Sequence, residues 1–198
     1  MKYIKLFEEY KDDNKILIIK DKNQLILTDI NYKVLSNIQI SEMDKNTFYV
    51  GGVASEKGLR LGYSLYIYMM MNIYPKKLMP SRDGDVREGA WKIWERIYNN
   101  NDIKRELLDM DDENYSISII TGDENDTGLS KEEVLEFIED EKEYNENVVD
   151  VLNIFNTKYS IKPDKFFKEN IIDMKNLPFD IQKKLSDDID YFFSSRYE

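Results

Sequence analysis

The sequence of 198 residues contains no cysteine and no histidine. Disulfide bonds, thiolate nucleophiles, zinc sites built from Cys or His, and catalytic triads built on His are therefore excluded. Any acid–base chemistry must be carried by Asp, Glu, Tyr, Lys or an ordered water molecule. A carboxylate-only Mg²⁺ or Ca²⁺ site is chemically open, but the spacing of Asp and Glu predicts none. The loop 122–128 begins like a calcium loop, yet Val134 stands where its bidentate Glu is required.

Long apolar runs are also missing from the sequence. No stretch of 18 consecutive residues is apolar, which predicts no transmembrane helix and no membrane partner. The first ten residues, MKYIKLFEEY, lack the apolar stretch and small-residue cleavage site of a secretory signal. We therefore expect a cytoplasmic protein.

Positive charge is scarce in the second half of the chain. Residues 1–100 carry 16 basic and 13 acidic side chains, whereas residues 101–198 carry 12 basic and 26 acidic ones. The net charge of the whole chain is −11. Because an acidic surface repels phosphate backbones, we expect no nucleic-acid partner, and the acidic half is typical of a solvated helical surface.

What the sequence does contain is a series of short apolar runs and amphipathic segments. Strands are predicted over 15–20, 24–28, 33–40, 47–54, 76–80 and 114–121, with the first two forming a hairpin and 76–80 parallel to 47–54. Helices are predicted over 59–73, 85–100, 131–144 and 146–157 and after Pro178, the third opened by a capping box of Ser130 and Glu133. This order predicts an α+β fold. We divide it into an N-terminal segment 1–14, a domain 15–121 and a helical acidic extension 122–198.

A glycine-punctuated turn, EKGLRLGYSLY at residues 56–66, joins the strand 47–54 to the following helix. A strand that enters a helix this way leaves backbone N–H groups pointing outward, where the helix dipole adds positive charge. Gly58 and Gly62 would let the backbone approach a pyrophosphate closely. Arg60 stands between them, where a third glycine would suit a phosphate better. The pattern is compatible both with a phosphate site and with a plain turn.

The turn and the residues after it resemble the GCN5-related N-acetyltransferases, whose acetyl-CoA loop reads R/Q-x-x-G-x-G/A at the end of the fourth strand. Residues 57–62, KGLRLG, occupy that pattern, and residues 58–104 resemble a group of tailed-phage proteins assigned to this fold. The resemblance covers about residues 15–121 and implies a mixed, mostly antiparallel sheet flanked by helices. It implies acetyl-CoA as the cofactor, bound by Val53, Lys57, Gly58, Leu59, Arg60, Leu61, Gly62, Tyr63 and Ser64.

Two departures from the family pattern bear on activity. Arg60 replaces the first glycine of the loop, where its side chain would obstruct the pyrophosphate or pair with it. The family helix after the fifth strand presents Asn-x-x-Ala-x-x-x-Tyr, and the Tyr protonates the leaving thiolate. Here Arg87, Ala90 and Trp94 occupy these positions, and an indole N–H cannot deliver that proton near neutral pH. Tyr98, one turn later, substitutes only if the helix shifts.

Two further candidates follow the strand 76–80. Ser81 and Arg82 lie where the acceptor or the CoA thiol approaches in the family. Arg82 would bind an anionic acceptor or hold its own loop in place. The candidate catalytic residues are therefore Tyr98, Arg82 and Ser81, and no residue is assigned as the base.

The sequence leaves two functions open. The first is an acyl-CoA-dependent N-acetyltransferase with an unknown amine acceptor. The second is a catalytically inactive member of the fold, carried in a phage virion or directed at a host protein. The N-terminus bears on the second, because MKYIKLFEEY resembles capsid-targeting peptides of large tailed phages, with Leu6-Phe7-Glu8 as the cleavage site. Residues 1–8 would then direct packaging in the phage head; otherwise they form a short amphipathic helix. Localisation is thus the host cytoplasm or the virion interior.

Overall fold

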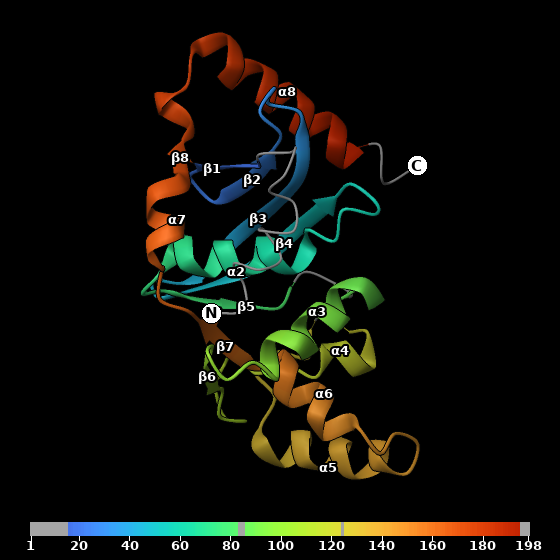
Figure 1. Cartoon of the computed structure of the whole chain (residues 1–198). Coiled ribbons are helices and arrows are strands. Elements are labelled where there is room, and N and C mark those ends of the chain that lie inside the picture. Colours follow the sequence, from blue (N-terminus) through green and yellow to red (C-terminus); the bar gives the residue numbers. More distant parts are fainter. Residues whose placement is uncertain (1–15, 83–85, 124, 195–198) are drawn as a thin grey trace. The chain divides into compact units, whose positions relative to one another are not determined.

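The computed structural model describes residues 16–82, 86–123 and 125–194 (Figure 1). The chain is α+β, with a mixed, mostly antiparallel sheet and helices beside it, as predicted. It divides into two compact units, and each is assembled from segments that are distant in sequence. The described part of unit 1 comprises residues 16–40, 52–74 and 162–194, and that of unit 2 comprises 41–51, 75–82, 86–123 and 125–161. The predicted boundary between residues 121 and 122 falls within unit 2. The predicted segment 1–14, with the peptide 1–8, lies outside the described residues.

Unit 1 pairs its strands in the order β4-β3-β2-β1-β8. The elements that it contains wholly or in part are β1 (Leu17–Asp21), β2 (Gln24–Thr28), β3 (Val34–Asp44), β4 (Thr47–Ser55), α2 (Gly62–Ile73), α7 (Lys165–Asn170), β8 (Ile171–Asp173), the 3₁₀ helix η1 (Met174–Asn176) and α8 (Phe179–Ser194). The strands β1 and β2 form the predicted antiparallel hairpin, with Leu17 opposite Thr28. The strand β8 joins β1 in parallel, with Ile18 opposite Ile171.

Both faces of the hairpin in unit 1 are buried. Ile19 and Ile26 pack with Leu185 and Ile189 of α8 on one face. Because side chains alternate along a strand, Leu25 points to the other face, where α2 contacts β2. The helix α2 is accordingly buried on most sides, as the sequence predicted, and its buried residues are Tyr63, Leu65, Tyr66, Ile67, Tyr68, Met69, Met70 and Met71.

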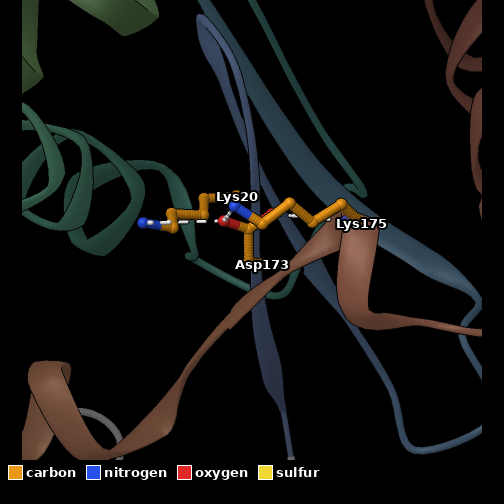
Figure 2. A network of polar contacts seen from close by, with 3 residues as sticks. All are labelled: Lys20, Asp173 and Lys175. Atoms are coloured by element: carbon orange, nitrogen blue, oxygen red, sulfur yellow. Dashed lines mark hydrogen bonds and ion pairs between the residues drawn. The ribbon is translucent and has the colours of Figure 1, made fainter.

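An ion-pair network links β8 to β1 in unit 1. The register places Lys20 opposite Asp173. Figure 2 shows the Asp173 carboxylate between two ammonium groups, with Nζ of Lys20 at 4.0 Å and Nζ of Lys175 at 3.2 Å from its Oδ2. Desolvation raises the pKa of Asp173, but hydrogen bonds from Lys175 and the charges of both lysines outweigh it and lower the pKa below the ordinary 3.8.

Unit 2 pairs its strands in the order β3-β4-β5-β7-β6. Besides the remaining parts of β3 and β4, its elements are β5 (Lys77–Met79), α3 (Glu88–Tyr98), β6 (Lys104–Leu107), α4 (Ser118–Thr121), α5 (Lys131–Lys142), α6 (Val148–Phe155) and β7 (Thr157–Ser160). The strand β5 is parallel to β4, with Thr47 opposite Lys77, whereas β7 is antiparallel to both β5 and β6. The prediction of a parallel strand beside 47–54 is confirmed.

One cluster of buried residues lies within unit 2. Its buried residues are Met79, Leu108, Tyr115, Ile117, Val134, Ile138, Val148 and Leu152. The helices α5 and α6 lie side by side (Figure 1) and contribute Val134, Ile138, Val148 and Leu152 to this cluster. The predicted capping box is confirmed, because Ser130 Oγ accepts from Glu133 N and Glu133 Oε2 accepts from Ser130 N.

One predicted strand is wrong. Residues 118–121 form the helix α4 instead of continuing a strand from residue 114. The cause is a side chain 40 positions away: Asn156 bonds both the N–H and the C=O of Ser116, at 3.0 and 2.8 Å. The Asn156 amide thus supplies the backbone hydrogen bonds of Ser116 that a neighbouring strand would supply if the alternating SIS pattern formed a strand.

Three short strands were not predicted: β6, β7 and β8. Residues 122–198 carry the helices α5, α6, α7 and α8, but this segment also contributes β7 and β8 to the sheet. The predicted helix 146–157 therefore ends at Phe155. Each of the three strands is only three or four residues long, and such segments are held by distant partners more than by local propensity.

Candidate functional site

The loop between β4 and α2 turns through two residues with positive φ. Gly58 has φ +89° and Arg60 has φ +52°. Positive φ is natural for glycine and uncommon for other residues, so Arg60 occupies a backbone conformation that favours glycine. This is the position where the family pattern has its first glycine. The loop thus keeps a glycine-like conformation although its residue is arginine.

The N-terminus of helix α2 has no side-chain cap for its backbone N–H groups. Its N-cap is Leu61, whose side chain cannot accept a hydrogen bond, and its first turn contains no acidic residue. The bond from Leu65 N to Leu61 O, at 3.0 Å, opens the intrahelical series. A helix supplies no acceptor of its own to the N–H groups of its first turn, and its dipole places positive charge there. These features favour an anionic ligand.

Side chains around the loop add positive charge. Lys57 and Arg60 are exposed, while Val53, Leu59 and Ser64 are half-buried and Leu61 and Tyr63 are buried. The neighbouring carboxylate of Glu56 is engaged with Lys33 Nζ at 3.0 Å. A side-chain carbon added at Gly58 would meet no atom of the described residues within 4 Å. A side chain at Gly58 would therefore meet open space, and the exposed Lys57 and Arg60 add positive charge to the loop.

Two aromatic residues of α3 in unit 2 have structural contacts. Trp94, which occupies the family Tyr position, is 1% exposed and packs on Tyr159 with ring centroids 5.2 Å apart. Tyr98, the last residue of the helix, is half-buried. Arg105 lies over the Tyr98 ring at 5.1 Å and donates to its carbonyl oxygen at 2.6 Å. Both aromatic rings thus help to hold α3 against the sheet of unit 2.

Arg82 in unit 2 holds its own surroundings together. Its Nη2 donates to Phe155 O at 3.1 Å and to Asn156 Oδ1 at 3.3 Å. Its Cζ lies 4.1 Å from the centroid of the Phe155 ring. Burial lowers the pKa of Arg82 to about 10, although Asp112 and two tyrosines counteract this. Arg82 therefore stays charged at neutral pH.

Asn156 is a residue that the sequence analysis missed. Its Oδ1 accepts from Arg82 and from Ser116 N, and its Nδ2 donates to Ser116 O and to Leu152 O. These four bonds use the whole hydrogen-bonding capacity of the amide. The sequence did hold a signal, an Asn inside the apolar run VLNIFNTKYS. A buried amide must be hydrogen-bonded, so an Asn in such a run indicates a structural role.

The candidates fall into two groups. The predicted cofactor-binding residues, Val53 and 57–64, belong to unit 1, while Ser81, Arg82 and Tyr98 belong to unit 2. Within the described residues, no group of three or more Asp or Glu side chains is placed to hold a metal ion. Asp123, from the calcium-like loop, accepts from the N–H of Asn125 in an ordinary turn. In the part of the chain that the structure describes, no helix is long and apolar enough to cross a membrane.

No protein-family model, no curated protein and no solved structure matches the chain.

Proposed function

We propose that this chain binds acetyl-CoA as a GCN5-related N-acetyltransferase-like protein, with Val53 and residues 57–64 as the cofactor site. The observation that carries the proposal is the turn between β4 and α2. It combines a strand, two residues of positive φ and a helix start without acidic residues. The parallel pairing of β4 with β5 adds support, because the resemblance required a strand at 76–80 beside 47–54.

The loop residues divide the work of binding. The first turn of α2 and the cations of Lys57 and Arg60 attract the pyrophosphate. The absence of a side chain at Gly58 allows close approach. Near the end of β4, backbone N–H groups at Val53 would polarise the acyl carbonyl. Bound acetyl-CoA would supply an acyl thioester, open to direct attack by an amine acceptor.

We also propose an alternative, a catalytically inactive member of the same fold, carried in a virion or directed at a host protein. The buried Trp94 favours it, because an indole replaces the phenol that protonates the leaving thiolate. Tyr98 is engaged by Arg105 and is a poor replacement. Cleavage after Glu8, detected by mass spectrometry of virions, would support the virion role, and an intact N-terminus there would remove it.

Calorimetric titration of acetyl-CoA into the full chain tests binding. Arg60→Gly keeps the positive φ accessible but removes the cation, so we expect it to weaken binding about tenfold, equal to about 1.4 kcal/mol. Lys22→Gly is the matched control, because Lys22 is also exposed and has φ +42° but lies in the β1–β2 turn. Acyl transfer to a panel of amines then separates the enzyme from the inactive form. Absence of saturable heat from the wild-type protein would contradict the acetyl-CoA proposal and favour the inactive form.

A further inference from the structure

The guanidinium of Arg82 is fixed in place but only partly bonded. Its Nη2 donates to Phe155 O and Asn156 Oδ1 at the end of α6. The guanidinium also lies over the Phe155 ring. Asn156 is itself held by its bonds to Ser116 and Leu152. The position of the cation is therefore set by groups that cannot easily move.

Two nitrogen atoms of Arg82 lack partners. Its Nε and Nη1 are buried, and neither has a hydrogen-bond partner among the described residues. Arginine carries five N–H donors and accepts nothing, so these atoms need acceptors. Buried polar groups are hydrogen-bonded in the great majority of cases. Two orphaned donors on one charged group are thus a marked exception.

The surrounding side chains do not balance this charge. Among the described residues no carboxylate lies within ion-pairing distance of Arg82. Asp112 attracts it from further away, while accepting bonds from Asn114 N and Nδ2. The hydroxyl of Tyr159 donates to Ile154 O at 2.8 Å. A buried cation is costly unless an anion accompanies it.

We infer that Arg82 anchors a binding site in unit 2 for a small anion that bears a carboxylate or a phosphate group. The planar guanidinium matches both groups and would bond their oxygen atoms through Nε and Nη1. Phe155 and Asn156 hold the guanidinium in position before the anion arrives. The site consists of unit 2 residues and does not depend on the acetyl-CoA loop of unit 1.

The full chain can be titrated with sodium succinate and with sodium phosphate, using sodium chloride at matched ionic strength as the reference. We expect one of the two anions to raise the melting temperature in a saturable way, and the stronger response identifies the group. Arg82→Lys keeps a charge but loses the planar donors, so the affinity should fall at least tenfold. Arg105→Lys is the control, because Arg105 also lies over an aromatic ring and donates to a carbonyl but is exposed.

A second measurement uses the wild-type protein alone and is needed if Arg82→Lys fails to fold. The Nε–H signal of Arg82, among those of six arginines, should shift and become protected from exchange as the anion is added. An unchanged Arg82 signal would overturn the inference. So would equal responses of wild type, Arg82→Lys and Arg105→Lys, since these would reflect general screening.

Discussion

Both units have exposed ion pairs, but they differ in the place of one unusual cation, which is exposed in unit 1 and buried in unit 2. In unit 1, charged groups stay near solvent and are paired, as Lys33 is with Glu56 and Asp173 is with two lysines. Among its described residues, Lys22, Tyr32 and Arg60 have positive φ, and the side chain of Arg60 is exposed. In unit 2, the Arg82 guanidinium is buried, and two of its nitrogen atoms have no hydrogen-bond partner among the described residues. We conclude that unit 1 is strained in its backbone and unit 2 in its electrostatics.

The largest effect is expected at Asn156. Asn156→Ala leaves the buried N–H and C=O of Ser116 without their side-chain partner and removes one acceptor of Arg82 Nη2, which keeps Phe155 O. Each such loss costs about 1–3 kcal/mol, so we expect a loss of about 3–5 kcal/mol in the free energy of unfolding. Urea denaturation measures it, with the half-buried Asn153→Ala as control. Equal losses in the two variants would show that the hydrogen bonds of Asn156 do not stabilise unit 2 more than an ordinary Asn side chain does.

The second effect separates the charge of Arg82 from its volume. Arg82→Met fills the same space without a buried cation, so we expect stability within about 1 kcal/mol of wild type, since such replacements are often neutral or stabilising. Arg82→Ala removes the packing on Phe155 as well and should cost about 2–3 kcal/mol more. Urea denaturation of both variants provides the test. A loss in Arg82→Met as large as that in Asn156→Ala would show that the cation stabilises unit 2.

A smaller effect tests the backbone of unit 1. A left-handed backbone conformation costs about 1–2 kcal/mol in a residue other than glycine. Glycine removes this cost, but it also gives the unfolded chain more conformational entropy, which offsets part of the gain in stability. Arg60→Gly and Lys22→Gly should therefore each stabilise the protein by up to about 1 kcal/mol. Thermal unfolding without ligand measures both. Destabilisation of Arg60→Gly alone would mean that its side chain makes contacts that matter to the fold.

The smallest effect concerns the exposed network of unit 1. The pKa of Asp173 is lowered in the folded protein, so its contribution is present above the unfolded pKa and is lost as the pH falls through the folded pKa. Asp173→Asn should therefore weaken the dependence of stability on pH below about pH 5. Urea midpoints at several acidic pH values measure this, with the exposed Asp190→Asn as control. Identical pH profiles for Asp173→Asn and wild type would show that the ion pairs of Asp173 do not contribute to stability.

Sequence patterns predicted the elements whose causes are local. The alternation in 47–54, the stop at Pro75 and the capping box of Ser130 each act within a few residues, and the corresponding elements are present. The prediction of a strand over 114–121 was wrong because the hydrogen-bond partner of its Ser116 backbone is Asn156, 40 positions later. Short strands such as β7 likewise depend on partners that no local window contains.

The candidate site divides in the same way. The turn at residues 56–61 was predictable, because glycine spacing between a strand and a helix is a local signal. The positive φ of Arg60 was not, since arginine rarely adopts it. The partners of Arg82 come from Phe155 and Asn156, 73 and 74 positions away. Only folding brings them together.

The most direct test of the central claim is to map the backbone amide shifts of the wild-type chain as acetyl-CoA is added. We predict saturable shifts concentrated at Val53 and residues 57–64, with the Nε–H signal of Arg82 unchanged. This result would place acetyl-CoA on the loop of unit 1 and leave the anion site of unit 2 separate. No shifts, or shifts that avoid residues 57–64, would contradict the proposed cofactor site.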